Sequence, residues 1–153
     1  MEMVKIFPPV EVLLPHADPM LLLNECTDFG DDFAATRCVI GDKCRLFRMA
    51  DGRFGSWLLI ELMAQTIGVF AGLKNRTQGL GPKIGFLLGT RRFETSVGFL
   101  HEGDIVDVKT NCVFFGQEGL PSQFECRAEM NGNVVATANL TVFEPEDLEI
   151  WKN

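Results

Sequence analysis

The sequence predicts an α+β fold in which one strongly curved antiparallel sheet wraps around one long central helix. Two observations carry this prediction. Residues 56–74 (SWLLIELMAQTIGVFAGLK) are apolar on nearly every face, so a helix formed there must be covered on most sides. The segments around it have strand patterns, in the order two strands, helix, four strands. All 153 residues (1–153) are expected to form one domain, because this length suits a single hydrophobic core.

The elements up to the end of the helix each have a local signal. Residues 21–29 (LLLNECTDF) and 33–40 (FAATRCVI) have strand composition and flank the turn sequence GDD. Residues 41–55 contain glycines and basic side chains and predict a loop with short helical pieces. Ser56 is expected to cap the start of the helix. Gly79 and Gly81 are expected to end it.

Everything after the helix reads as strand: residues 83–94, 104–115, 123–130 and 134–144, with a hairpin at NGN, residues 131–133. A single sheet curved around one helix is the hotdog fold. Because such a sheet keeps free edges, we expect a dimer joined edge to edge.

Charge and composition exclude several function classes. The net charge of −7 argues against broad binding to nucleic acids or to anionic membranes. The N-terminal apolar pieces are short and broken by prolines, which predicts neither a signal peptide nor a membrane span. We expect no metal and no organic cofactor, because the cysteines lack CxxC spacing and no histidine lies near them.

The cysteines are expected to be reduced thiols in a cytoplasmic protein, because their number is odd and no export signal is present. Symmetry about the predicted turns suggests that Cys26 faces Cys38 and that Cys112 faces Cys126.

Glu61 is the first candidate for chemistry, since it interrupts the apolar helix and is followed at i+4 by Gln65. Three interpretations are open. It could lie on an exposed stripe of the helix, or it could be a buried structural acid bonded to Gln65 or to the backbone. It could also be a functional acid, because a carboxyl group in an apolar slot can stay protonated at neutral pH and donate a proton.

Two further features could serve a reaction. His16 is a candidate base, because a neutral imidazole accepts protons near neutral pH, although a loop histidine often has no role. His101 precedes a predicted turn and is expected to be exposed. The first amides of the helix, at Gly55, Ser56 and Trp57, could bind an oxygen that gains negative charge, or could simply begin an ordinary helix.

The segments that contain these residues resemble one family. LLPHADPMLLLNEC (13–26) resembles the LPHRYPFLLVDRV opening of the β-hydroxyacyl-acyl-carrier-protein dehydratases, and WLLIELMAQTIGVFAG (57–72) is similar to their GVLIIEAMAQAAGVLA helix. FLLGTRRFETSVGFLHEGDIV (86–106) resembles their following strand, basic stretch and GD turn. The resemblance implies the hotdog fold, Glu61 as catalytic acid, and a tunnel between two protomers that admits a pantetheine arm.

The chain departs from that family at one motif. The family's catalytic histidine lies in GHFPG before the helix, whereas this region reads KCRLFRMADGRFGSW, with Phe47 about where the histidine would stand. The sequence therefore resembles a divergent branch, similar to the accessory dehydratases of aryl-polyene pathways. Either His16 has taken the role of the base, or a partner subunit supplies one, or the chemistry is lost.

Three functions follow as hypotheses. The first is dehydration of a 3-hydroxyacyl thioester, on acyl carrier protein or coenzyme A, to the trans-2-enoyl thioester, with Gln65 among the substrate-binding residues. The second is a hotdog acyl thioesterase, and the third is a non-catalytic subunit of a hetero-oligomeric dehydratase. An acidic carrier protein would need a basic surface on which to dock. Five arginines could form such a basic rim, or they could be scattered solvated charges, which is the simpler interpretation: Arg45, Arg48, Arg53, Arg91 and Arg92.

Overall fold

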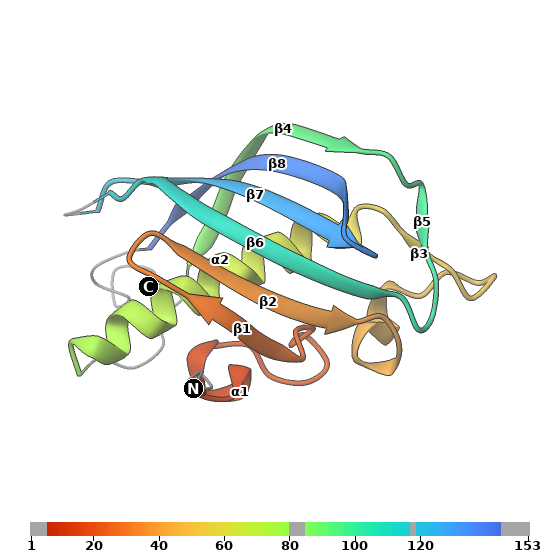
Figure 1. The fold of residues 1–153 in the computed structure, drawn as a ribbon, viewed down its shortest axis with the longest axis horizontal. Helices are drawn as coiled ribbons and strands as arrows, with labels where there is room; N and C mark the ends of the chain where they lie inside the picture. Colours follow the sequence, from red (N-terminus) through yellow and green to blue (C-terminus); the bar gives the residue numbers. More distant parts are fainter. Residues whose placement is uncertain (1–5, 80–84, 117–118, 145–153) are drawn as a thin grey trace, which may run out of the picture.

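A six-stranded antiparallel sheet arches over the long helix α2 and covers it on one side (Figure 1). This is a computed structural model that describes residues 6–79, 85–116 and 119–144. The strand order is β1-β2-β6-β7-β8-β4, and a two-stranded ribbon, β3-β5, lies at one end. The predicted α+β hotdog architecture is therefore confirmed.

The helical elements are α1 (Val10–Leu13), the 3-10 helix η1 (Asp42–Phe47) and α2 (Leu58–Thr77). The strands are β1 (Glu25–Phe29), β2 (Phe33–Val39), β3 (Phe54–Gly55), β4 (Phe86–Thr95), β5 (Phe99–Leu100), β6 (Ile105–Phe114), β7 (Ser122–Met130) and β8 (Asn133–Phe143). The six long strands match the six predicted ones. The short helix α1 and the two-residue strands β3 and β5 were not predicted, because segments this short have no periodicity to detect.

The start of α2 differs from the prediction. Trp57, with φ −60° and ψ −21°, occupies the N-cap position, and no side chain caps the helix. The amide of Ser56 donates instead to the carbonyl of Gly98, at 3.1 Å, which joins the helix start to the loop before β5. At the other end the helix stops near Gly79, as predicted, where φ is +74°. Gly81 lies outside the described residues.

The hairpin at residues 131–133 is confirmed. Asn131 and Gly132 both have positive φ, 54° and 80°, which is the backbone conformation of a type I′ turn. The turn pairs Met130 with Asn133, and an irregularity between Ala128 and Glu129 then shifts the register of β7 against β8. Beyond it, alternate residues from Ala136 to Leu140 are buried and those between them are exposed.

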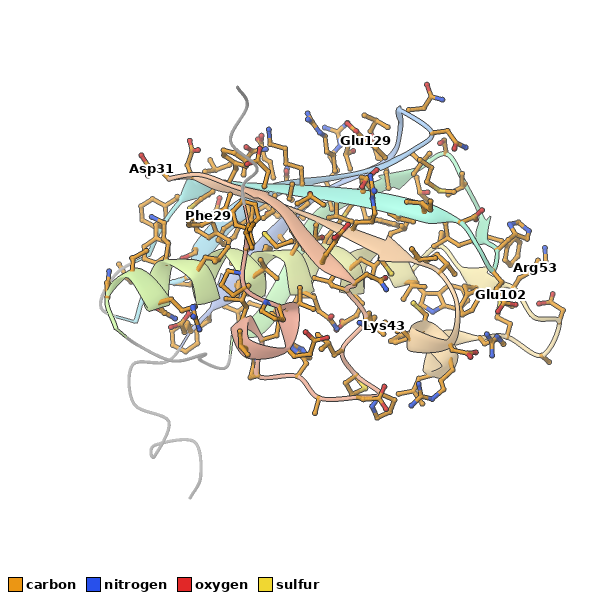
Figure 2. The ribbon with its side chains drawn as sticks, turned by 60° about the horizontal axis from the view of Figure 1, so that its bottom comes forward. Phe29, Asp31, Lys43, Arg53, Glu102 and Glu129 are labelled. Carbon is orange, nitrogen blue, oxygen red and sulfur yellow. The ribbon has the colours of Figure 1, made fainter. Side chains whose placement is uncertain are left out.

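The first predicted strand is shorter than expected. Only Glu25–Phe29 pair as a strand, whereas residues 20–24 form an extended segment, here called the strap. Its backbone is held mainly by side chains: Gln65 of α2 contacts Met20 and Leu22, and Lys43 of η1 donates to the carbonyl of Leu23 at 2.6 Å. Figure 2 shows Lys43 beside this part of the chain.

The core lies between α2 and the concave face of the sheet. Phe70 of α2 is fully buried and contacts the rings of Phe29 and Phe124, with centroids 6.1 and 5.7 Å apart. Phe29 points from the sheet toward the helix (Figure 2). A buried hydroxyl pair, Thr36 on β2 and Thr66 on α2 at 2.8 Å, fixes the helix against the sheet.

Phe70→Ala should lower the free energy of unfolding by about 3–5 kcal/mol, because it leaves a cavity between the helix and two sheet aromatics. Urea denaturation followed by circular dichroism measures this loss. Leu46→Ala, at a side chain that is 56% exposed, is the control and should change stability by less than about 0.5 kcal/mol. Equal losses in the two variants would contradict a core centred on Phe70.

Candidate functional site

One pocket of about 180 Å³ brings together the two residues that the sequence singled out for acid–base chemistry, His16 and Glu61. It lies along α2, beside the loop that follows α1 and the strands β4 and β8. The other lining residues are Pro15, Ala64, Gln65, Ile67, Gly68, Ala71, Gly85, Leu87, Val142 and Glu144. Two residues 45 positions apart in the sequence therefore line one partly apolar pocket.

Small residues give the helix side of this pocket its shape. Ala64, Gly68 and Ala71 follow Glu61 at helical spacing, so they lie along one face of α2. The side chain of Leu14 packs where a side chain at Gly68 would stand, and the small side chains of Ala64 and Ala71 leave space beside the helix. The same small residues stand at i+3, i+7 and i+10 from Glu61 in the sequence, a signal that could have located the pocket.

Gln65 is almost completely buried, at 1% exposure, and its amide orientation is determined by its partners. The amide of Leu22 can only donate, and it donates to Oε1 of Gln65 at 3.0 Å. The carbonyl of Met20 can only accept, and it accepts from Nε2 at 2.7 Å. Nε2 therefore has one hydrogen left, and it donates to Oε1 of Glu61 at 3.1 Å.

This geometry assigns Gln65 a different role from the predicted one. Both of its amide hydrogens are used within the chain, so it has no donor left for a substrate. Gln65 instead connects Glu61 to the strap. The side chain of Glu61 is half-buried at the pocket, which rejects the exposed-stripe interpretation and leaves the structural and functional interpretations compatible with each other.

His16 is half-buried in the loop between α1 and the strap. Its Nδ1 atom is buried and has no hydrogen-bond partner among the described residues. Most metal-free active-site histidines are oriented by a bond to one ring nitrogen. Within the described part of the chain, no such bond orients the ring or selects its tautomer.

The backbone amides that were predicted to bind a negatively charged oxygen lie outside this pocket. Gly55, Ser56 and Trp57 do not line the pocket of His16 and Glu61. The amide of Ser56 is already bonded to Gly98, so Ser56 was wrongly expected to be a free donor. Gly55 lies directly beneath the indole ring of Trp57, where a side chain would clash, so a glycine is required there for packing.

The predicted basic rim is largely neutralised by neighbouring acids. Ion pairs of 2.8–3.3 Å join Arg45 to Asp18, Arg48 to Asp42, Arg53 to Asp51 and Arg92 to Glu94. Figure 2 shows Arg53 and Glu102 at the same end of the molecule. His101 is exposed, as predicted, with its amide bonded to Asp104.

Within the described residues, no cluster of three or more histidine, cysteine or acidic side chains could hold a metal ion. None of the helices in the same part of the chain combines the length and the hydropathy that crossing a membrane requires.

The pocket reaches an open edge of the sheet. Leu87, which lines it, belongs to β4, and β4 is the last strand in the sheet order. Leu87 and Leu88 are 42% and 57% exposed. Apolar side chains on a strand with one free edge are typical of an edge that a partner covers.

A curved antiparallel sheet packed over one long central helix defines this chain as a hotdog-fold protein. The family model described as ApeP dehydratase matches residues 8–152. The chain therefore belongs to the ApeP-like dehydratase family. Among curated proteins, no significant sequence match was found.

Solved structures agree with this assignment. The dehydratase heterocomplex ApeI:P from Xenorhabdus doucetiae contains a chain that is 27% identical, with a TM-score of 0.88, covering 96% of this chain and 97% of that one. A hypothetical thioesterase with coenzyme A from Streptococcus pneumoniae shares the fold at 18% identity and a TM-score of 0.56, covering 79% and 84%. A virulence protein from Campylobacter jejuni also shares the fold, at 9% identity and a TM-score of 0.66, with a match that covers 94% of this chain and 90% of that one.

Gln65→Leu should lower the free energy of unfolding by about 2–4 kcal/mol, because it leaves the amide of Leu22 and the carbonyl of Met20 buried without partners. Urea denaturation is the measurement. The same substitution at the exposed Gln123 is the control, with an expected change below about 0.5 kcal/mol. If the two variants lose the same stability, the bonds of Gln65 do not hold the strap.

Proposed function

We propose that this chain dehydrates a 3-hydroxyacyl thioester to the trans-2-enoyl thioester, working with a second hotdog subunit. One observation carries the proposal: His16 and Glu61, a base and an acid, line the same pocket. Membership of the ApeP-like dehydratase family supports it. Elimination of water needs both groups, because the α-proton is weakly acidic and hydroxide is a poor leaving group.

Gln65 determines which oxygen of Glu61 would carry the transferable proton. Because Nε2 of Gln65 donates to Oε1, that oxygen serves as an acceptor, and the acidic proton belongs on Oε2. In the proposed reaction His16 removes the α-proton, and Oε2 of Glu61 gives its proton to the leaving 3-hydroxyl group. Water then departs, and a double bond forms between the α- and β-carbons. Polarisation of the thioester carbonyl by the amides of Gly55 and Trp57 stays a prediction.

Two features of the site support a second subunit. The pocket ends at the open edge strand β4, and Nδ1 of His16 lacks a partner within the described chain. The similar chain from Xenorhabdus is part of a dehydratase heterocomplex, which supports a related hotdog subunit as the partner here. A homodimer is the other arrangement. The acyl chain would be presented on acyl carrier protein or coenzyme A, and the free thiols suit the cytoplasm.

A direct assay separates the three hypotheses. A 3-hydroxyacyl thioester is incubated with the chain, alone and with candidate hotdog partners, while enoyl absorbance and free thiol are recorded. The proposed function predicts enoyl formation without thiol release. Release of thiol would establish the thioesterase instead. Enoyl formation that requires this chain beside its partner, but is unchanged by Glu61→Gln and His16→Ala, would identify a non-catalytic subunit.

Glu61→Gln should fold normally and should reduce the dehydration rate by about 100-fold or more, because the amide has no proton to transfer to the leaving group. His16→Ala should lose a comparable amount if His16 is the base. The exposed Glu102 and His101 supply matched controls, Glu102→Gln and His101→Ala, which should retain full activity. Full activity in Glu61→Gln would remove this carboxyl group from the mechanism.

A further inference from the structure

Two buried thiols lie close together next to the strap. The Sγ atoms of Cys38, at the end of β2, and Cys44, in η1, are 3.8 Å apart, and both residues are fully buried. The symmetric pairing of Cys26 with Cys38 expected from the sequence was wrong, because the register places Cys26 opposite Thr36. All five cysteines are free.

This thiol pair is connected to Glu61 by an unbroken series of contacts. Sγ of Cys38 donates to the carbonyl of Leu22 at 3.3 Å. The backbone amide of Leu22 donates to Oε1 of Gln65, and Nε2 of Gln65 donates to Glu61. One peptide segment is thus held on one side by a thiol and on the other by the residue that orients the proposed acid.

We propose that the Cys38–Cys44 thiol pair is a redox-sensitive positioning element for Glu61. A small two-electron oxidant, such as a peroxide, would join the two sulfurs as a disulfide. The two thiols lose two protons and two electrons in this step, and a hydrogen peroxide molecule is reduced to two waters. The effect on catalysis rests on the proposed function, whereas the effect on the strap does not.

Disulfide formation would displace the strap through two contacts. The sulfurs must approach from 3.8 Å to about 2.0 Å, which draws η1 and β2 together. Cys38 would lose the S–H group that donates to Leu22. Lys43, the neighbour of Cys44, would move its ammonium group relative to the carbonyl of Leu23. A shift of about 1 Å in a positioned catalytic group can reduce the rate by about 100-fold.

Cys44 is the better nucleophile of the two. The neighbouring thiol of Cys38 lowers the pKa of Cys44, and the charges of Lys43 and Arg48 act in the same direction. Burial protects the pair while η1 is closed. Because η1 is a short 3-10 helix with an exposed Leu46, its local opening gives a small oxidant access.

The test treats the folded chain, with its partner subunit present, with diamide, a small diazene oxidant that takes up two hydrogens per disulfide. Peptide mass mapping should find Cys38 joined to Cys44. Hydrogen exchange of the Leu22 amide should become at least about tenfold faster, because its bond to Gln65 is disturbed. Dehydration should fall at least about tenfold, and dithiothreitol should restore both.

Controls separate this pair from the other thiols. Cys44→Ala, compared with its own untreated sample, should be insensitive to diamide in both measurements, while Cys112→Ala should respond as the unaltered chain does. The proposal is overturned if no Cys38–Cys44 disulfide forms, if the disulfide forms without a change in exchange at Leu22, or if a protein that dehydrates when reduced keeps its rate when oxidised. If the disulfide accelerates exchange at Leu22 but the reduced protein never dehydrates, the positioning element stands and the proposed function fails.

Discussion

The three hydrogen bonds of Gln65 are the interaction on which the proposed site depends. A carboxamide can donate twice and accept from two directions, and this one joins the helix, the strap and the proposed acid through a single rigid group. Loss of any partner would leave a buried polar atom unsatisfied, which is costly in an apolar interior. The same bonds therefore stabilise the fold and fix the orientation of Glu61.

The fold explains why the pocket lies where it does. The sheet covers one side of α2, and the strap and α1 pack against another part of it (Figure 1). Beside the small residues of α2, next to the edge strand β4, neither element fills the space. The exposed edge and the exposed pocket are thus consequences of one feature, a sheet that stops before it has enclosed its helix. A second subunit at β4 would complete both.

Much of this arrangement could be predicted from the sequence. The all-round apolar character of residues 56–74 determined the central helix, and the NGN turn determined the last hairpin. The start of the helix could not be predicted, because Ser56 satisfies its amide through Gly98, a tertiary contact 42 residues away. Residues 21–24 have strand composition, yet side chains from α2 and η1 bond the amide of Leu22 and the carbonyl of Leu23, and backbone pairing with β2 begins only at Asn24.

In the site, too, local sequence features could be predicted and tertiary contacts could not. Glu61 and His16 were identifiable because each stands out in its local sequence and in motifs that resemble one family. The role of Gln65 was not, because two of its partners are backbone atoms 43 and 45 residues away, which leave no trace in a sequence pattern. The proximity of Cys38 and Cys44 likewise depends on how η1 folds back against β2, a step that local propensity does not specify.

The central claim is that Glu61 and His16 act on one substrate in the pocket that they both line. A crystal structure of the chain and its partner subunit with a 3-hydroxyacyl amide, an unreactive analogue of the thioester, tests this most directly. The account predicts the 3-hydroxyl group within about 2.6–3.2 Å of Oε2 of Glu61, with Oε1 still bonded to Gln65. It also predicts the α-carbon about 3–3.5 Å from a ring nitrogen of His16. An analogue bound with its α-carbon beyond reach of His16, or outside this pocket, would contradict it.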